Sequence, residues 1–481
     1  MEPEQHDVVV LGGGLAGLTA ATTAALAGAT VKLLDAHPLG GRARTTTDDS
    51  GALFNGGPCA LYLGGAAERV LGCLGVEVTG RRPLRSGGRV ALAGRSHVLP
   101  VGAGSLLSSR AISAGSKPAL ARLLTGLRLI EPSVMAGQSV EDWLAKARLR
   151  PDAAALVRAL IRLATYTART DLLDAGAGLA QLGQAVGPGV LYLDGGWQQI
   201  VDSLERVALA ASVQLVSGTA ARSVEPLAEG AGEAPEAAAR PDSGDPAGAA
   251  GMAAPRWRVA TSAGDIHARS VVLALGTPGA AERVSTQPLH LGDLGEPVSA
   301  ACLELALRRS PKVNFLLGIE EPLYLSRHSP PARLAPEGIE VVHVARYGVR
   351  DAATDRGQLA SHAQMAGIDL GDVVAERFLA RMVVSAAMPL AELGGLRGRP
   401  PVVVEGCDGL FLAGDWVGEE GMLGDAVFAS GDLAGRSAAA SVRRTRSARA
   451  SGASILDTGA AVRDAIVRGE GAVAPAGGVA R

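Results

Sequence analysis

The stretch that decides the fold is DVVVLGGGLAGLTAATTAALAGATVKLLDA, residues 7–36. An apolar strand at 8–11 leads into a glycine turn, and a small-residue helix at about 15–27 and a second apolar strand at 30–34 follow it. Apolar runs of strand length on both sides of a helix indicate a βαβ unit. The sequence therefore predicts an α/β fold with a Rossmann-like nucleotide-binding domain.

The turn inside this stretch matches G-x-G-x-x-G at Gly12, Gly14 and Gly17. Gly12 permits the tight turn, Gly14 lets a pyrophosphate approach the backbone, and Gly17 lets the helix pack closely on the strand. The N-terminus of the helix supplies free N–H groups and a partial positive charge to the phosphates. The turn predicts a site for a dinucleotide.

An acidic residue and a second glycine pair extend the motif. Asp35 ends the second strand, eighteen residues after Gly17, where a carboxylate can hydrogen-bond the ribose of adenosine. Gly40, Gly41 and Arg42 follow. They suit a second backbone approach to a pyrophosphate, with the arginine as its counter-charge. A plain NAD domain does not need this extension.

A similar layout occurs near the other end of the chain, in GLFLAGDWVGEEGMLGDAVFASG, residues 409–431. An apolar strand at 409–413 stops at Gly414 and Asp415, and a glycine-punctuated turn and a small-residue helix follow. Alone, this block fits a ligand-binding carboxylate as well as an ordinary turn residue that caps a helix. The N-terminal fingerprint favours the cofactor interpretation.

With these motifs the chain resembles the flavoproteins with two dinucleotide-binding motifs, which include amine oxidases, protoporphyrinogen oxidase and the phytoene or squalene desaturases. Five segments follow the family's order, at 7–42, 52–62 (ALFNGGPCALY), 191–204 (LYLDGGWQQIVDSL), 256–278 (RWRVATSAGDIHARSVVLALGTP) and 409–431. Together they span about 435 residues and are far more specific than any one of them alone.

The resemblance implies FAD as the cofactor. It implies that Asp415 hydrogen-bonds the ribityl chain, and that the turn after it directs backbone N–H groups toward the pyrimidine edge of the ring. Ser430 and Gly431 would let their helix pack against the first glycine helix. The residues expected to bind the cofactor are Gly12, Gly14, Leu15, Ala16, Gly17, Asp35, Ala36, Gly41, Arg42, Gly57, Pro58, Ala221, Gly414, Asp415, Met422, Leu423 and Ala426.

The positions of the family segments also predict the domains. The discontinuous FAD-binding domain would comprise 1–95, 190–280 and 395–445, with an inserted mixed substrate domain at 96–189 and 281–394. Within the latter, 116–130 and 138–149 have helical spacing, 338–348 alternates like a strand, and 371–383 is predicted to be helical. The Pro-, Ala- and Gly-rich segment 226–255 is predicted to be a disordered loop, and 446–481 a flexible tail with a short helix near 460–468.

Composition limits the partners. A net charge of −2 gives no electrostatic case for nucleic acid. Four scattered cysteines favour a reducing compartment, the acidic start lacks the basic region of a signal peptide, and no apolar run is long enough to span a membrane. We expect a cytoplasmic protein that binds a small molecule, and a peripheral membrane contact stays open.

The reacting groups are less apparent. No histidine spacing indicates a metal, no G-x-S-x-G elbow occurs, and no catalytic side chain is assigned. Cys59 would lie near the flavin by resemblance, more as a small packed side chain than as a reactive thiol. A second fingerprint for NADPH is not found, so the reduced flavin would pass electrons to oxygen, a quinone or another acceptor, unless the net reaction is an isomerisation.

Substrate class is the widest choice. Aromatic residues make up only 3% of the chain, and Lys312 lies in what looks like an exposed turn, so the aromatic cage and water-positioning lysine of amine oxidases are not evident. We therefore expect an FAD-dependent oxidoreductase that takes hydride from a C–H of a lipophilic molecule, with Met422, Leu423, Tyr166 and Trp197 as candidate pocket residues. The alternatives are an amine or amino-acid oxidase, and a non-catalytic prenyl- or lipid-binding chaperone.

Overall fold

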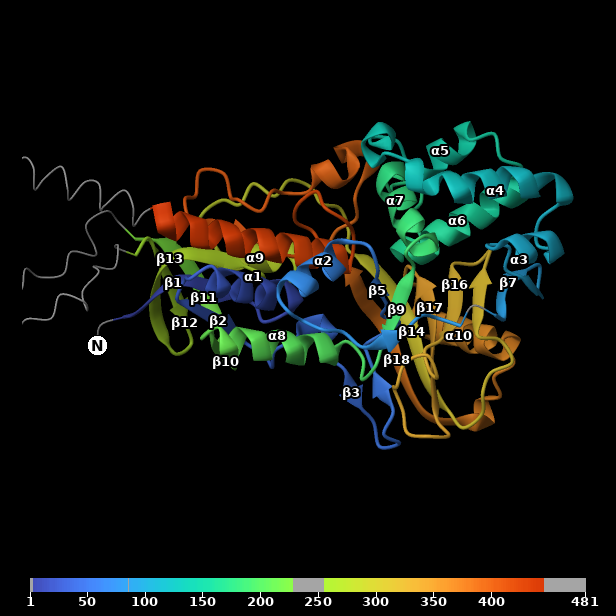
Figure 1. Ribbon diagram of the computed structural model, residues 1–481, viewed down its shortest axis with the longest axis horizontal. Helices are drawn as coiled ribbons and strands as arrows, with labels where there is room; N and C mark the ends of the chain where they lie inside the picture. The colour runs from blue at the N-terminus through green and yellow to red at the C-terminus, as the bar shows by residue number, and fades with distance from the viewer. Residues whose placement is uncertain (1–2, 85, 228–254, 445–481) are drawn as a thin grey trace, which may run out of the picture.

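Two seven-stranded sheets, each covered by helices, form the protein in the computed structural model, which describes residues 3–84, 86–227 and 255–444 (Figure 1). The first sheet has the order β10-β2-β1-β13-β12-β11, and β19 pairs with β13. Its strands are β1 (Glu4–Leu11), β2 (Val31–Asp35), β10 (Gln214–Ser217), β11 (Ala221–Pro226), β12 (Trp257–Thr261), β13 (Gly264–Leu273) and β19 (Leu410–Leu412).

The predicted βαβ unit is confirmed as β1, α1 (Leu15–Leu26) and β2, with β1 and β2 parallel. Helix α1 lies between α8 (Gln198–Ala210) and the helical residues 424–444 (Figure 1). A Cβ on Gly431 would lie 2.6 Å from the Ala16 carbonyl oxygen, so only a glycine allows this approach. The expected packing of the C-terminal helix on α1 is thus present.

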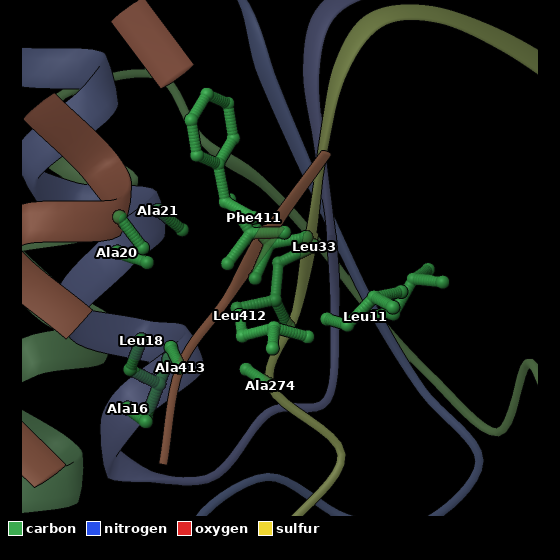
Figure 2. Packing of buried hydrophobic residues seen from close by; sticks show 14 of the residues in the cluster. Leu11, Ala16, Leu18, Ala20, Ala21, Leu33, Ala274, Phe411, Leu412 and Ala413 are labelled. Carbon is green, nitrogen blue, oxygen red and sulfur yellow. The ribbon is translucent and has the colours of Figure 1, made fainter. Parts of the chain in front are cut away.

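Small and aliphatic side chains fill the layer between these helices and the sheet. Figure 2 shows Ala16 and Leu18 of α1 with Leu412 of β19 and Ala413, directly after that strand. All belong to one buried cluster that also includes Leu11 of β1. Alanines at the contact allow the helix to lie close to the sheet, which places the N-terminus of α1 at the sheet edge.

The second sheet has the order β18-β14-β17-β16-β15-β7-β8 and is antiparallel except where β7 pairs with β15. Helix α10 (Ala352–Met365) packs on it. The strands are β7 (Gly88–Leu92), β8 (Arg95–Val98), β14 (Val298–Leu307), β15 (Phe315–Gly318), β16 (Leu323–Arg327), β17 (Glu340–Tyr347) and β18 (Val373–Ser385).

One prediction in this region is wrong. Residues 371–383 are expected to be helical, but 373–383 belong to the thirteen-residue strand β18, which pairs antiparallel with β14 along most of its length. The spacing of apolar residues did suggest a helix, but β-branched valines at both ends and the long partner strand favour the extended backbone. The strand expected at 338–348 is confirmed as β17.

Five helices cover one side of the second sheet (Figure 1). They are α3 (Ala103–Ser108), α4 (Lys117–Gly126), α5 (Val140–Lys146), α6 (Pro151–Thr165) and α7 (Ala175–Val186), so helices are present in the segments expected at 116–130 and 138–149. The shorter elements are α2 (Ala66–Cys73), α9 (Pro278–Val284), β3 (Thr46–Thr47), β4 (Leu53–Phe54), β5 (Leu61–Tyr62), β6 (Gly80–Arg81) and β9 (Val190–Leu193).

The first sheet draws its strands from chain segments 4–35, 214–273 and 410–412, and the second from 88–98 and 298–385. The domain boundaries remain a prediction, and β7 and β8 lie across the expected boundary at 95. Most of the loop expected at 226–255 and the tail expected at 446–481 lie outside the described residues. Among the described helices, none combines the length and apolarity that crossing a membrane requires.

Candidate functional site

The two glycine-rich turns meet at one edge of the first sheet. Strands β1, β2 and β19 run parallel to their shared neighbours, so their carboxyl ends lie at the same edge. Gly12 follows β1, Asp35 ends β2, and Gly414 and Asp415 follow β19. Ligands of open α/β sheets bind beyond the carboxyl ends of the strands. The fold therefore joins motifs that are about four hundred residues apart.

Each fingerprint glycine has a distinct steric reason. Gly12 has a φ of 105°, and a Cβ there would lie 2.2 Å from the Ala274 carbonyl oxygen. A Cβ on Gly17 would lie 1.8 Å from the Gly12 carbonyl oxygen. At Gly14, in contrast, nothing lies within 4 Å of an added Cβ. Gly12 and Gly17 thus shape the turn, while Gly14 leaves open space at the start of α1, where a phosphate can approach.

Asp35 fixes this turn from below. One carboxylate oxygen accepts from the Gly13 N–H at 2.6 Å, and the other accepts from the His37 N–H at 2.7 Å. The second glycine pair adds to the same surface, because the Gly40 N–H donates to the Gly13 carbonyl at 2.7 Å. An added Cβ on Gly41 would lie 3.3 Å from the Gly14 Cα. Both glycine segments therefore present backbone to one space.

Arg42 and Asp415 join the two turns. The guanidinium donates to one carboxylate oxygen at 2.8 Å, and the Ala386 N–H donates to the same oxygen at 3.2 Å. The other oxygen of Asp415 is buried and has no partner within the described residues. Arg42 is 44% exposed, whereas Asp415 is 2% exposed. A buried carboxylate oxygen without a donor indicates that a ligand group, such as a hydroxyl, completes the site.

The turn after Asp415 is held by its own helix. Gly414 exchanges hydrogen bonds with the Ser430 hydroxyl, at 3.0 Å from its N–H and 2.9 Å to its carbonyl. Leu423 has a φ of 53°, and the helix starts at residue 424. The N-terminus of this helix therefore lies at the turn that contains Met422, with the partial positive charge such ends carry.

The segment at Gly57 and Pro58 is held from the second sheet. The Gly57 N–H donates to Glu304 at 3.0 Å, and this glutamate is fully buried on β14. Arg377 donates to its other oxygen at 2.5 Å, and the His343 ring lies 3.2 Å from the first. Burial raises the pKa of Glu304, but the hydrogen bonds and charges of His343 and Arg377 outweigh it and lower the pKa to about 2.

Cys59 follows this segment directly, and its side chain is half-buried. Burial raises the pKa of its thiol to about 12, and the charge of Glu304 acts in the same direction. A thiol with so high a pKa is a poor nucleophile, because the thiolate is the reactive form. The packed interpretation is the better supported of the two.

Three tyrosines gather beside Pro58. The Tyr166 hydroxyl donates to the Pro58 carbonyl at 2.9 Å and lies 3.0 Å from the Tyr324 hydroxyl. The rings of Tyr324 and Tyr347 are stacked with centroids 5.5 Å apart, and Tyr166 meets both edge-on. Burial raises the pKa of all three hydroxyls well above the usual value, so they are neutral donors at physiological pH.

All the predicted cofactor residues except Ala221 fall into three groups. The first surrounds the fingerprint and includes the exposed Ala36, the second is Gly57 with Pro58, and the third is the turn from Gly414 to Ala426. Ala221 opens β11, and Thr219, two residues earlier, donates its N–H to the Asp35 carbonyl at 2.9 Å. The bound role of each remains a prediction. Trp197 contacts the third group, since an added Cβ on Gly424 would lie 3.3 Å from its ring.

Sequence reasoning did not find Glu304, Arg399 or the tyrosine cluster. Glu304 could have been noticed as the one acid inside the apolar strand VSAACLELAL, residues 298–307. Tyr324 and Tyr347 lie on different strands, and nothing local relates them to Tyr166. Within the described residues, no group of three or more His, Cys, Asp and Glu side chains could hold a metal ion.

The donor set fits a dinucleotide. It combines an open glycine turn at a helix start, a carboxylate at Asp35, a cation at Arg42 and a carboxylate oxygen without a partner on Asp415. Those groups match a long ligand whose phosphates lie between two parts that carry hydroxyl groups.

Comparisons with known proteins agree with this assignment. Residues 10–74 match the NAD(P)-binding Rossmann-like domain. Putrescine oxidase bound to putrescine is similar over 90% of this chain and 98% of its own, at 17% identity and a TM-score of 0.64. Cyclohexylamine oxidase from Brevibacterium oxydans is similar over 91% and 98%, at 16% identity and a TM-score of 0.62. An oxidoreductase from Methanosarcina mazei is similar over 89% and 99%, at 18% identity and a TM-score of 0.63.

No curated protein sequence matches the chain. Fold and turn together define an α/β protein with a Rossmann-like dinucleotide-binding unit. More particularly, the fold is shared with putrescine oxidase, cyclohexylamine oxidase and the oxidoreductase from Methanosarcina mazei, and the α/β fold with a Rossmann-like domain predicted from the sequence is confirmed.

Proposed function

We propose that the protein binds FAD and oxidises a small organic molecule by taking hydride from a C–H. The observation that carries this proposal is the ion pair between Arg42 and Asp415, which joins the two glycine turns at the sheet edge. The fold shared with putrescine oxidase and the orphaned oxygen of Asp415 support it. A non-catalytic lipid chaperone has no need of a glycine turn for a diphosphate or of a carboxylate oxygen left free for a ligand.

In this proposal, each turn binds one half of the cofactor. Gly14 and the start of α1 contact the diphosphate, and Arg42 offsets its charge. Asp35 accepts from the adenosine ribose, and the free oxygen of Asp415 accepts from the ribityl chain. When bound, the flavin accepts the hydride, and the protein orients the substrate and excludes water.

A lipophilic substrate is the first candidate. The buried cluster that contains Met422 also includes Met388, Tyr347 and Leu160 of α6, so the side chains packed between the helices and the second sheet are mainly apolar. Such surroundings favour an apolar substrate. Oxygen or a quinone is the proposed electron acceptor.

An amine or amino-acid substrate is the second candidate, and the tyrosine cluster favours it. Three of the five tyrosines in the chain lie together beside Pro58. Tyrosine faces attract cations, so an ammonium group would be stabilised there. The low aromatic content of the whole sequence concealed this local concentration.

The test is to mix the purified protein with FAD, measure flavin absorption, and follow its anaerobic reduction by polyenes and by amines. We expect bound flavin and reduction by one of the two panels. Reduction by amines alone would assign the second candidate. A protein that stays colourless at saturating FAD would overturn both and favour the chaperone alternative.

A matched variant links the result to the site. Gly14→Ala adds a Cβ where nothing lies within 4 Å, so folding should be unaffected while the phosphate approach is narrowed. We expect the Kd for FAD to rise ~10-fold or more, which corresponds to about 1.4 kcal/mol. Unchanged FAD affinity in Gly14→Ala would contradict the assignment of this turn.

A further inference from the structure

Arg399 is a buried cation next to the C-terminal turn. It is 5% exposed, and its Nη1 donates to the Gly421 carbonyl at 2.8 Å. The backbone around it is fixed to the same turn, because the Gly418 N–H donates to the Pro400 carbonyl at 2.9 Å. The guanidinium therefore lies one residue away from Met422, on the side of the site expected to face the flavin ring.

Two of its nitrogen atoms, Nε and Nη2, are buried and have no hydrogen-bond partner among the described residues. Within the described residues, no aspartate or glutamate forms an ion pair with Arg399. The negative charge of Asp415 attracts the guanidinium of Arg399, but one oxygen of this carboxylate is already paired with Arg42. A buried charge with unmet donors is costly, which indicates that a ligand supplies the missing acceptor.

Arg399 has donors without acceptors, and Asp415, next to the same turn, has an acceptor oxygen without a donor. Asp415 can accept from a hydroxyl, whereas Arg399 can only donate. The diphosphate is already expected to be bound by the fingerprint turn and by Arg42, the ion-pair partner of Asp415. The acceptor nearest the 421–423 turn would then be a carbonyl oxygen at the pyrimidine edge of the ring.

We propose that Arg399 contacts the dioxopyrimidine edge of the bound flavin and stabilises the negative charge that the reduced ring carries there. This rests on the proposed FAD binding. The contact would act together with the helix start at residue 424, whose partial charge has the same sign. Arg399 is thus a cofactor contact that tunes how readily the flavin accepts electrons.

The cation persists at neutral pH. Burial lowers the pKa of the Arg399 guanidinium to about 10, with Asp415 acting in the opposite direction. It therefore remains protonated in the pH range in which flavin potentials are measured. A neutral acceptor would leave its charge unbalanced, whereas an anionic reduced ring would offset it.

The experiment measures the two-electron reduction potential of the FAD-bound full chain by equilibration with a reference dye. In Arg399→Gln, we expect the reduction equilibrium to be ~10-fold less favourable, which corresponds to a potential lower by ~30 mV. Arg399→Met keeps the packed stem and should show the same loss. Arg399→Lys keeps the charge and should have a reduction potential close to that of the wild type.

Arg397→Gln is the matched control, because this arginine is exposed on the same segment. It should leave the potential unchanged. Variants at 399 that bind FAD less tightly but keep the wild-type potential would overturn the proposal, since Arg399 would then contact the diphosphate or only support the turn. A wild-type chain that binds no FAD would overturn the proposed function as well, and an unchanged Arg399→Gln with normal FAD binding would overturn this inference alone.

Discussion

The two glycine-rich turns at the sheet edge are held in place by different kinds of contact. The turn at 12–17 is shaped by backbone contacts, and a Cβ added to Gly17 would lie 1.8 Å from the Gly12 carbonyl oxygen. The turn at 414–423 is held mainly by side chains, through Arg42, Ser430 and Arg399. The first turn is limited by main-chain atoms, including the distant Ala274 carbonyl, whereas the second depends on side chains, of which Arg42 comes from a distant segment.

This difference determines what each turn tolerates. A turn built on backbone contacts fails when a Cβ is added at Gly12 or Gly17, because the obstacle is a main-chain atom that cannot move aside. A turn held by ion pairs and hydrogen bonds loses a part of its stability when a partner is removed, and water can replace exposed partners. We therefore expect an added Cβ in the first turn to cost more stability than the loss of one side-chain partner in the second turn.

The largest effect is expected from Gly17→Ala. The new Cβ would lie 1.8 Å from the Gly12 carbonyl oxygen, so α1 must shift from the sheet, and we expect a loss of more than ~4 kcal/mol or failure to fold. The measurement is the free energy of unfolding in denaturant. Gly72→Ala in α2 is the control, because it is exposed with nothing within 4 Å, and it should stabilise by ~0.5–1 kcal/mol. Equal effects of the two substitutions would contradict the role of Gly17.

A smaller effect is expected from Glu304→Gln, which removes the buried charge that holds Gly57. The lowered pKa corresponds to about 3 kcal/mol of stabilisation at neutral pH. Because the folded-state pKa is depressed, this stabilisation is present above pH 4.5 and is lost as the pH falls toward 2. The difference in unfolding free energy between wild type and variant, measured against pH, should shrink through that window. A difference independent of pH would argue against the charge.

The smallest effect is expected from the pair of Arg42 and Asp415. A double-mutant cycle with Arg42→Gln and Asp415→Asn should give a coupling of ~1 kcal/mol, since Arg42 is partly exposed and water screens the pair. Calorimetric titration with FAD should show that Asp415→Asn weakens the free energy of FAD binding by more than it lowers the free energy of unfolding. If Asp415→Asn retains wild-type FAD affinity, the ribityl role is wrong.

Sequence reasoning succeeded where a structural requirement was local. The unit from β1 to β2 was predicted within a few residues, because a glycine turn between two apolar runs leaves little conformational choice. It failed for β18, where residues 371–383 have apolar spacing compatible with a helix. There the long partner strand β14 decided the outcome, and pairing with a distant strand leaves no local signal.

By itself, the sequence determined the α/β fold with its Rossmann-like unit and the two glycine-rich turns, since glycine positions and apolar strands act through backbone sterics within short segments. Only the tertiary structure decided the partners. It paired Arg42 with Asp415, buried Glu304 under Gly57, placed the unpaired guanidinium of Arg399 beside the second turn, and gathered Tyr166, Tyr324 and Tyr347. These contacts depend on which distant strands and helices become neighbours, because a side chain's charge or hydroxyl gains its meaning from the groups that surround it after folding.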